Sequence, residues 1–353
     1  MPKISVLLPA YQHERYIAAT LTSLLEQRES DLEIIAVDDG STDWTGEILD
    51  AFAKLDSRLR VFHKQNEGVA AALRFALERA SGEWIASCGS DDIVPPRAYT
   101  ALLKNSAESD IIIGEFCEID DKNRCTRVHL SFGESCFSAL FAMPAMWNKL
   151  IRRDFLTRAE LQFPNVLLCE DLILLAQIAA LHPRYACIKR DVYHYRNDVL
   201  SYRSMTHCFT PEYIRAHIVG RETVLRICSE ANIPEGIRYI YRDSLPFLAD
   251  LIQRMPSSED AEQVFRLFCA FLTAGQEAID AKWFEEIFCV PLGWLFDNTH
   301  RRYMEIVRQV PHEEFILRKF RTGKMGLQFA LQCIHAWASY KLDEKRGLRQ
   351  KRG

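Results

Sequence analysis

The first hundred residues alternate short aliphatic runs with longer segments of helical periodicity, and this alternation constrains the fold more than any other feature of the chain. Strands are predicted at residues 4–9, 32–37, 59–63 and 83–88, and helices at 15–27, 44–55 and 69–80. Pro95 and Pro96 open a further helix, because the missing N–H of proline does no harm at a helix N-terminus. Such alternation is typical of a mostly parallel sheet flanked by helices, so we predict an α/β fold.

The pattern changes twice further along the chain. Between residues 110 and 204 it is mixed, with a β run at 111–113 and helices at 135–141 and 171–181. After residue 206 only helical patterns remain, separated by polar breaks. We therefore predict an α/β domain at 1–205 and an α-helical domain at 206–353, and a length of 353 residues is sufficient for both.

Composition and charge exclude several classes of protein. A hydrophobic content of 48% with 26% charged residues is ordinary for a folded soluble protein. A net charge of −4 offers no attraction to nucleic acid, so no nucleic-acid partner is expected. The eleven cysteines are scattered without the spacing of a zinc site, and we interpret them as reduced core residues.

No apolar stretch reaches the roughly 18 residues that a membrane-spanning helix needs, and no secretory signal is evident at the N-terminus. We therefore expect a cytoplasmic protein. The C-terminal tail is basic, through Lys341, Lys345, Arg346, Arg349, Lys351 and Arg352. A solvated terminus is the favoured interpretation, and peripheral contact with the inner face of an anionic membrane is the alternative.

Polar side chains follow three of the predicted strands. Ligands of an open α/β sheet bind at the carboxyl ends of its strands, which here carry residues 9–11, 38–43 and 90–92. Acid pairs at two of these ends favour a hard divalent cation, Mg²⁺ or Mn²⁺, which in turn holds a diphosphate. Each acid pair on its own also fits a turn or a helix N-terminal cap, but two pairs at one sheet edge favour the cation.

Several motifs occur together in a fixed order: ISVLLPAY at 4–11, VDDGSTD at 37–43, NEG at 66–68, SGEWIA at 81–86, SDD at 90–92, WNKL at 147–150, ED at 170–171 and YHYR at 193–196. In this order and spacing the chain resembles glycosyltransferase family 2 over roughly its first 205 residues. The resemblance implies a Rossmann-like GT-A fold, an inverting mechanism and a nucleotide-sugar donor.

Carried over position by position, the resemblance implies a donor site in which Ala10 and Tyr11 frame the nucleoside. Asp39, with Asp38 behind it, hydrogen-bonds the base. The implied nucleotide-sugar contacts are Pro9, Ala10, Tyr11, Asp38, Asp39, Asn66, Ser90, Asp91 and Arg196, and the implied metal ligands are Asp91, Asp92 and His194. The first Asp of a full D-x-D motif is replaced by Gly89.

Inverting transfer needs a base that takes the proton of the acceptor hydroxyl. Asp171 matches the acidic motif of the family and starts a predicted helix, with Glu170 as the second candidate. The alternative for both is an acid that stabilises a helix N-terminus. His194, Arg196 and Arg203 are predicted to form a lid over the leaving diphosphate, and Lys149 is a further basic candidate.

The resemblance implies transfer from a nucleotide-diphosphate sugar, with UDP favoured, to a hydroxyl of a glycan or lipid-linked glycan in bacterial surface polysaccharide synthesis. A nucleotidyltransferase and a dinucleotide oxidoreductase are disfavoured because no glycine-rich loop follows the first strand. A non-catalytic scaffold or carbohydrate-binding protein stays open because of Gly89, although it would need none of the site carboxylates. The oligomeric state is not specified.

Aromatic residues cluster in the helical segment at Trp283, Phe284, Phe288, Trp294 and Phe296. Core packing is the usual role of aromatics at helical spacing, and an acceptor site or protomer interface is the alternative.

Overall fold

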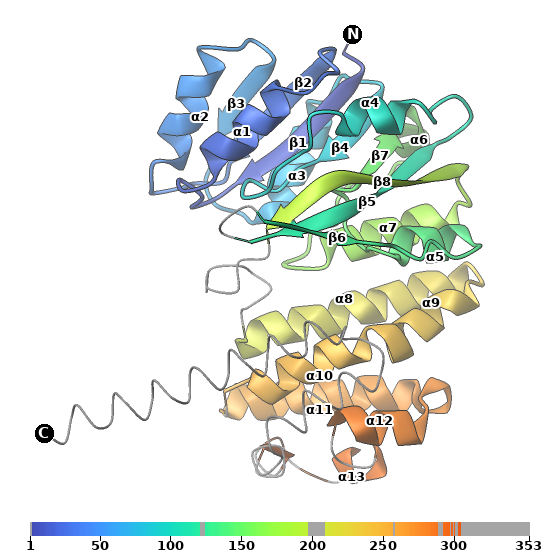
Figure 1. Cartoon of the computed structure of the whole chain (residues 1–353). Coiled ribbons are helices and arrows are strands. Elements are labelled where there is room, and N and C mark those ends of the chain that lie inside the picture. The colour runs from blue at the N-terminus through green and yellow to red at the C-terminus, as the bar shows by residue number, and fades with distance from the viewer. Residues whose placement is uncertain are drawn as a thin grey trace, which may run out of the picture. The chain divides into compact units, whose positions relative to one another are not determined.

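The computed structural model describes residues 2–120, 124–196, 209–256, 258–288 and 292–296, together with 298, 300, 303 and 304 (Figure 1). The chain divides into two compact units, Met1–Cys208 with Val219–Gly236 and Phe209–Ile218 with Ile237–Gly353. The domain boundary after residue 205 stays a prediction.

The first unit is built on one eight-stranded sheet. Its strands are β1 (Ile4–Ala10), β2 (Leu32–Asp38), β3 (Leu59–His63), β4 (Trp84–Ser87), β5 (Ile111–Ile119), β6 (Cys125–Val128), β7 (Lys149–Arg152) and β8 (Tyr185–Arg196). The order is β3-β2-β1-β4-β7-β5-β6, with β8 pairing β5. β1 to β4 are parallel, whereas β7 is antiparallel to both of its neighbours. The predicted α/β fold with a mostly parallel sheet is confirmed.

Helices cover both faces of this sheet. Alternate residues of β1, including Ile4 and Leu8, belong to one core cluster with residues of α1 (Ile17–Leu25), α2 (Thr45–Ala53) and α4 (Ala98–Leu103). The alanine-rich α3 (Val69–Glu78) packs against β1 and β2, where small side chains allow a close approach. β1 is therefore buried on both sides, as its continuous apolar sequence predicts.

Two apolar residues of the predicted helix 44–55 are not core residues. Trp44 is 67% exposed and Leu55 is 84% exposed. The helix begins at Thr45 and ends at Ala53, so both side chains lie beyond its ends, and Leu49 is its fully buried apolar residue.

The second half of the first unit adds α5 (Cys136–Phe141), α6 (Arg153–Arg158) and α7 (Glu170–Ala180). β8 then pairs with β5 in parallel. A disulfide joins Cys117 and Cys125, so the prediction of reduced cysteines is wrong for this pair. The physical reason is the antiparallel pairing of β5 with β6, which brings the two residues onto neighbouring strands. The free cysteines of the described chain are Cys88, Cys136, Cys169, Cys187, Cys228 and Cys269.

The described elements after residue 209 are all helical, which confirms a helical C-terminal region. They are α8 (Pro211–Glu230), α9 (Pro234–Arg238), the π-helix Tyr239–Asp243, α10 (Leu245–Arg254), α11 (Glu259–Ala274), the 3-10 helix Gln276–Ala278, α12 (Ala281–Phe288) and α13 (Leu292–Phe296). Among the residues that the structure describes, no helix has both the length and the apolarity needed to cross a bilayer. Phe284 is buried, but the side chains of Trp283 and Trp294 and the basic tail lie outside the described set.

Candidate active site

Asp92 is a buried acid whose two oxygens are both occupied by hydrogen bonds. Its side chain lies just beyond the end of β4, where Tyr193 donates its hydroxyl to Oδ2 at 2.6 Å and Arg196 donates its backbone N–H to Oδ1 at 2.6 Å. Burial, followed by the nearby Asp91 carboxylate, raises the pKa of Asp92 to about 8. Burial therefore favours the protonated form of Asp92 more than water does, and its two hydrogen bonds join β8 to the end of β4.

Asp91 is the acid that is available to a ligand. Its side chain is half-buried, and its carboxylate makes no hydrogen bond or ion pair to any residue that the structure describes. The surrounding backbone is fixed: Arg196 donates Nε to the Asp91 carbonyl at 2.8 Å, and Thr20 donates to the carbonyls of Ser90 and Asp92 at 3.1 and 2.7 Å. The sequence predicted Asp91 and Asp92 together as metal ligands, and the structure gives the two acids different environments.

The glycine at position 89 is explained by the same packing. A Cβ at Gly89 would lie 2.7 Å from Asp92 Oδ2 and 3.1 Å from Asp91 Oδ1. The Gly89 N–H donates to the Tyr193 hydroxyl at 2.9 Å. A side chain is excluded here because the buried Asp92–Tyr193 pair fills the space.

Asp38 and Asp39, at the carboxyl end of β2, order the loops there. The Asp39 carboxylate accepts from Lys64 Nζ at 2.7 Å and from the backbone N–H groups of Glu67 and Gly68 at 3.1 and 2.7 Å. Asp38 accepts from the Ser41 N–H at 3.0 Å and pairs with His63 at 2.9 Å. Both carboxylates thus have protein partners, and the predicted bond from Asp39 to the base stays a prediction.

The remaining predicted donor contacts lie at the same edge of the sheet. Tyr11 is 47% exposed, and Asn66 is exposed in the loop that Asp39 holds. Ala10 is buried at the end of β1, whereas Pro9 is half-buried. Ser90 is buried, and its hydroxyl pairs with His13 Nδ1 at 2.5 Å.

The predicted lid is wrong for His194 and Arg196, because both lie within strand β8. The ring of His194 pairs with Asp191 Oδ2 at 2.8 Å, and none of its described contacts is with Asp91 or Asp92. The Arg196 guanidinium lies 5.0 Å from the centre of the Tyr16 ring. Arg203 lies outside the described residues.

Lys149 is not available to a diphosphate. It is 1% exposed, and Nζ donates to the carbonyls of Met143 and Ala145 and to Asn148 Oδ1 at 2.6–2.8 Å. Burial lowers its pKa to about 7, which the Asp171 carboxylate partly counters. Its role is to fix the loop before β7.

Asp171 lies in the first turn of α7 with its carboxylate held at one oxygen only. Oδ2 accepts the Met146 N–H at 3.0 Å, whereas Oδ1 is buried and has no hydrogen-bond partner among the described residues. Burial raises the pKa of Asp171 to about 6, although the Met146 N–H and the Lys149 ammonium lower it. Burial and the Asp171 charge raise the pKa of Glu170 to about 7. These shifts suit a base that works near neutral pH.

Trp147 connects the two acidic sites and was not predicted as a site residue. Its ring stacks on the rings of Tyr193 and Tyr195, with 4.4 and 5.7 Å between the ring centres. The preceding residue, Met146, supplies the N–H that holds Asp171, and Tyr193 holds Asp92. The sequence signal was present, because Trp147 and Tyr193 both lie in motifs of the resemblance.

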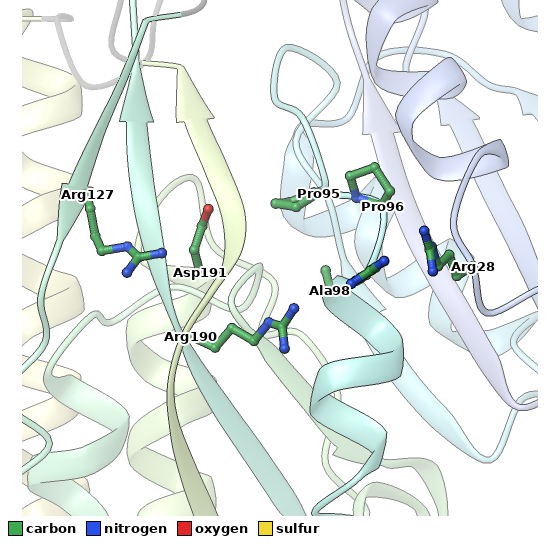
Figure 2. A pocket seen from close by; sticks show the side chains of 8 residues that line it. Arg28, Pro95, Pro96, Ala98, Arg127, Arg190 and Asp191 are labelled. Carbon is green, nitrogen blue, oxygen red and sulfur yellow. The ribbon is translucent and has the colours of Figure 1, made fainter.

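A separate pocket of about 400 Å³ opens beside the start of α4 (Figure 2). Its lining residues are Arg28, Pro95, Pro96, Arg97, Ala98, Arg127, Arg190 and Asp191. None of the predicted donor, metal or base residues lines it, so this basic pocket is distinct from the candidate active site.

Comparisons with known proteins identify the family of this chain. The profile described as Glycosyl transferase family 2 matches residues 5–163. Glycosyltransferase GlyG of Streptococcus pneumoniae is 30% identical over 55% of this chain and 70% of its own length. The putative glycosyltransferase EpsH of Bacillus subtilis is 31% identical over 55% of this chain, and the match spans 61% of that relative's length.

Among solved structures, S. aureus TarS 1-349 in complex with UDP is similar with a TM-score of 0.57, at 19% identity and 92% coverage of both chains. TarS 1-349 in complex with UDP-GlcNAc gives a TM-score of 0.53 over 87% of this chain and 92% of that one. A Pyrobaculum calidifontis mannosyltransferase, solved with GDP-Man and Mn²⁺, gives 0.50 at 17% identity over 78% of this chain and 84% of that one. These likenesses confirm the GT-A-like fold. The chain belongs to glycosyltransferase family 2.

Proposed function

We propose that the protein transfers a sugar, with inversion, from a nucleotide-diphosphate sugar to a hydroxyl of a glycan acceptor. The observation that carries this proposal is the division of roles between Asp91 and Asp92: one acid is fully hydrogen-bonded, and its neighbour is held in place with an uncommitted carboxylate. The UDP and UDP-GlcNAc complexes of TarS support a UDP-sugar as the donor.

A divalent cation, Mn²⁺ or Mg²⁺, fits the chemistry of this position, because carboxylate oxygens are the ligands of hard cations. Asp91 would hold it, and when bound the cation would neutralise charge on the donor diphosphate. The GDP-Man and Mn²⁺ complex of the Pyrobaculum enzyme supports this assignment. Thr20 and Arg196 keep the Asp91 backbone in place.

Asp171 is the proposed base. With a pKa of about 6 it is mostly ionised at neutral pH, so its carboxylate accepts the proton of the acceptor hydroxyl. The acceptor oxygen forms a bond to C1 of the sugar while the bond from C1 to the diphosphate breaks on the opposite face. The Met146 N–H orients the carboxylate through Oδ2, while Oδ1 makes no hydrogen bond to the described residues.

The scaffold alternative loses its main support. Gly89 suggested a degenerate motif, but its lack of a side chain follows from the packing of Asp92 and Tyr193.

We propose that the acceptor is a glycan or lipid-linked glycan of a bacterial surface polysaccharide, reached from the cytoplasmic side of the membrane. The bacterial origin of the relatives supports this setting.

A panel of nucleotide sugars, scored by release of free nucleotide with and without EDTA, tests the proposal. We expect release from one donor, lost with EDTA and restored by Mn²⁺ or Mg²⁺. Asp91→Asn should abolish the metal-dependent activity, whereas Asp92→Asn, an isostere of the protonated acid, should retain most of it. EDTA-resistant release, or equal loss in the two variants, would contradict the assignment of the cation to Asp91.

A further inference from the structure

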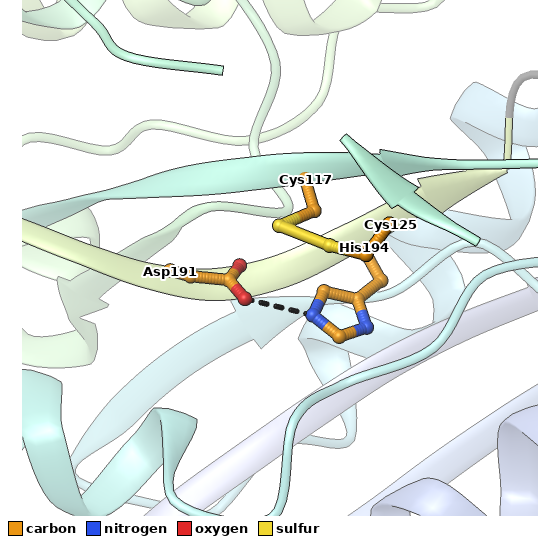
Figure 3. Close-up of a disulfide and its surroundings, with 4 residues drawn as sticks. All are labelled: Cys117, Cys125, Asp191 and His194. Atoms are coloured by element: carbon orange, nitrogen blue, oxygen red, sulfur yellow. Dashed lines mark hydrogen bonds and ion pairs between the residues drawn. A yellow bond between two sulfur atoms is a disulfide. The ribbon is translucent and has the colours of Figure 1, made fainter. Parts of the chain in front are cut away.

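Four side chains from three neighbouring strands come together at one point (Figure 3). They are Cys117 of β5, Cys125 of β6, and Asp191 and His194 of β8. Each offers one ligand atom, and these atoms all lie within 4.8 Å of one another. No other such group of metal-binding side chains occurs in the described part of the chain.

The donor set is that of zinc rather than of the cation proposed for Asp91. Two thiolates, an imidazole and a carboxylate are all zinc ligands, whereas Mg²⁺ and Mn²⁺ take oxygen. Tetrahedral bonds of about 2.0–2.3 Å place neighbouring ligand atoms about 3.3–3.8 Å apart. Side-chain shifts of about an ångström would bring the four atoms onto one ion, given their present separations.

Two further observations support a ligand at this point. Asp191 Oδ1 is buried and has no hydrogen-bond partner among the described residues. Asp191 Oδ2 lies 2.8 Å from His194 Nε2, so two of the four ligand atoms are already neighbours. The pairing of Cys117 with His194 in the β5–β8 register also fixes these two residues side by side.

We propose that the reduced protein binds one Zn²⁺ through Cys117, Cys125, Asp191 and His194, and that the disulfide is the metal-free, oxidised state of the same site. A dithiol reductant opens the disulfide by thiol–disulfide exchange, giving two protein thiols and the cyclic disulfide of the reductant. Zinc then displaces one proton from each thiol. Cys125 is exposed, so both the reductant and the ion reach the site.

The position of this site gives it a consequence for the donor site. His194 forms a two-way backbone bridge with Ile93, at 3.1 and 2.9 Å, directly after the Asp91–Asp92 pair. Tyr193 and Arg196, which hold Asp92, lie on the same strand. An ion bound to β5, β6 and β8 therefore stiffens the strand against which the donor loop rests.

Cobalt titration of the reduced full-length chain, freed of metal and kept reduced with a phosphine, tests the proposal. We expect one Co²⁺ per chain, with the intense visible bands of tetrahedral cobalt and a near-ultraviolet thiolate charge-transfer band, displaced by one equivalent of Zn²⁺. The bands should be absent from Cys117→Ser and from the oxidised wild type. They should persist in Cys187→Ser, which removes a free, half-buried cysteine of β8 outside the cluster.

A wild-type measurement covers the case in which Cys117→Ser fails to fold. Zinc should slow alkylation of Cys117 and Cys125 in the reduced chain, located by mass spectrometry, and leave that of Cys136 and Cys187 unchanged. Failure of the reduced wild type to bind Co²⁺ or to protect these two cysteines would overturn the proposal, as would equal loss of cobalt in Cys187→Ser. None of these outcomes depends on sugar transfer.

Discussion

Tyr193→Phe removes one hydroxyl that makes two short hydrogen bonds, one to Asp92 Oδ2 at 2.6 Å and one from the Gly89 N–H at 2.9 Å, besides a longer one to Cys88 Sγ at 3.9 Å. Each such bond contributes about 0.5–1.5 kcal/mol, so the two together give a loss of about 1–3 kcal/mol in the free energy of unfolding. At about 2–4 °C per kcal/mol, the Tm should fall by roughly 2–12 °C. The ring stays in place against Trp147, so little cavity forms.

The matched control is Tyr99→Phe. Tyr99 lies in the same core cluster, and its buried hydroxyl has no hydrogen-bond partner among the described residues. Its removal should leave the Tm unchanged or raise it. Differential scanning calorimetry of the two variants, with titration of a UDP-sugar and Mn²⁺, measures both stability and donor affinity. Equal Tm values for Tyr193→Phe and Tyr99→Phe would refute the role given to the Tyr193 hydroxyl.

Three further predictions concern the acids and the glycine. Gly89→Asp, which completes the D-x-D motif, should lower the free energy of unfolding by about 1–3 kcal/mol, because its side chain would overpack against Asp92. Gly293→Ala should leave it unchanged, because no atom lies within 4 Å of the added Cβ. Thermal denaturation of the two variants measures the difference. The acid limb of the kcat/KM profile should lie near pH 6, where Asp171 ionises, and should survive Glu170→Gln; its disappearance in that variant would assign the base to Glu170. Because burial raises the pKa of Asp92 from 3.8 to about 8, the unfolded chain binds fewer protons between these values, so this group costs stability as the pH rises from about 4 to 8. Asp92→Asn should reduce that slope in denaturant titrations, and an unchanged slope would contradict a protonated Asp92.

The first four strands and their polar ends were predictable because their signals are local. β1, β2 and β4 are mostly apolar runs bounded by turn residues, β3 is a shorter run with Arg60 inside it, and each observed strand agrees with its predicted range to within one residue at either end. Parallel pairing then places the carboxyl ends of β1, β2 and β4 at one edge. The convergence of residues 9–11, 38–43 and 90–92 at one edge of the sheet could therefore be predicted from the sequence.

β8 was missed because its sequence gives no clear period. The strand mixes charged and apolar residues, and its pairing with β5 is interrupted by register shifts after Gly114 and Glu115. Without β8, the sequence could not reveal that Tyr193 reaches Asp92 across 101 residues, or that Cys117 and His194 are neighbours. These contacts depend on the pairing of strands far apart in the sequence, which a local sequence pattern does not predict.

The most direct test of the central claim is sugar transfer by Asp171→Asn, measured with the donor that the nucleotide-sugar panel identifies and alongside the donor dissociation constant. Asparagine keeps the shape of the side chain and the acceptor for the Met146 N–H, but it cannot take a proton. We predict a loss of transfer of at least about a hundredfold, the usual contribution of a general base, with donor affinity unchanged. Transfer at the wild-type rate would contradict Asp171 as the base and, with it, the mechanism proposed for this site.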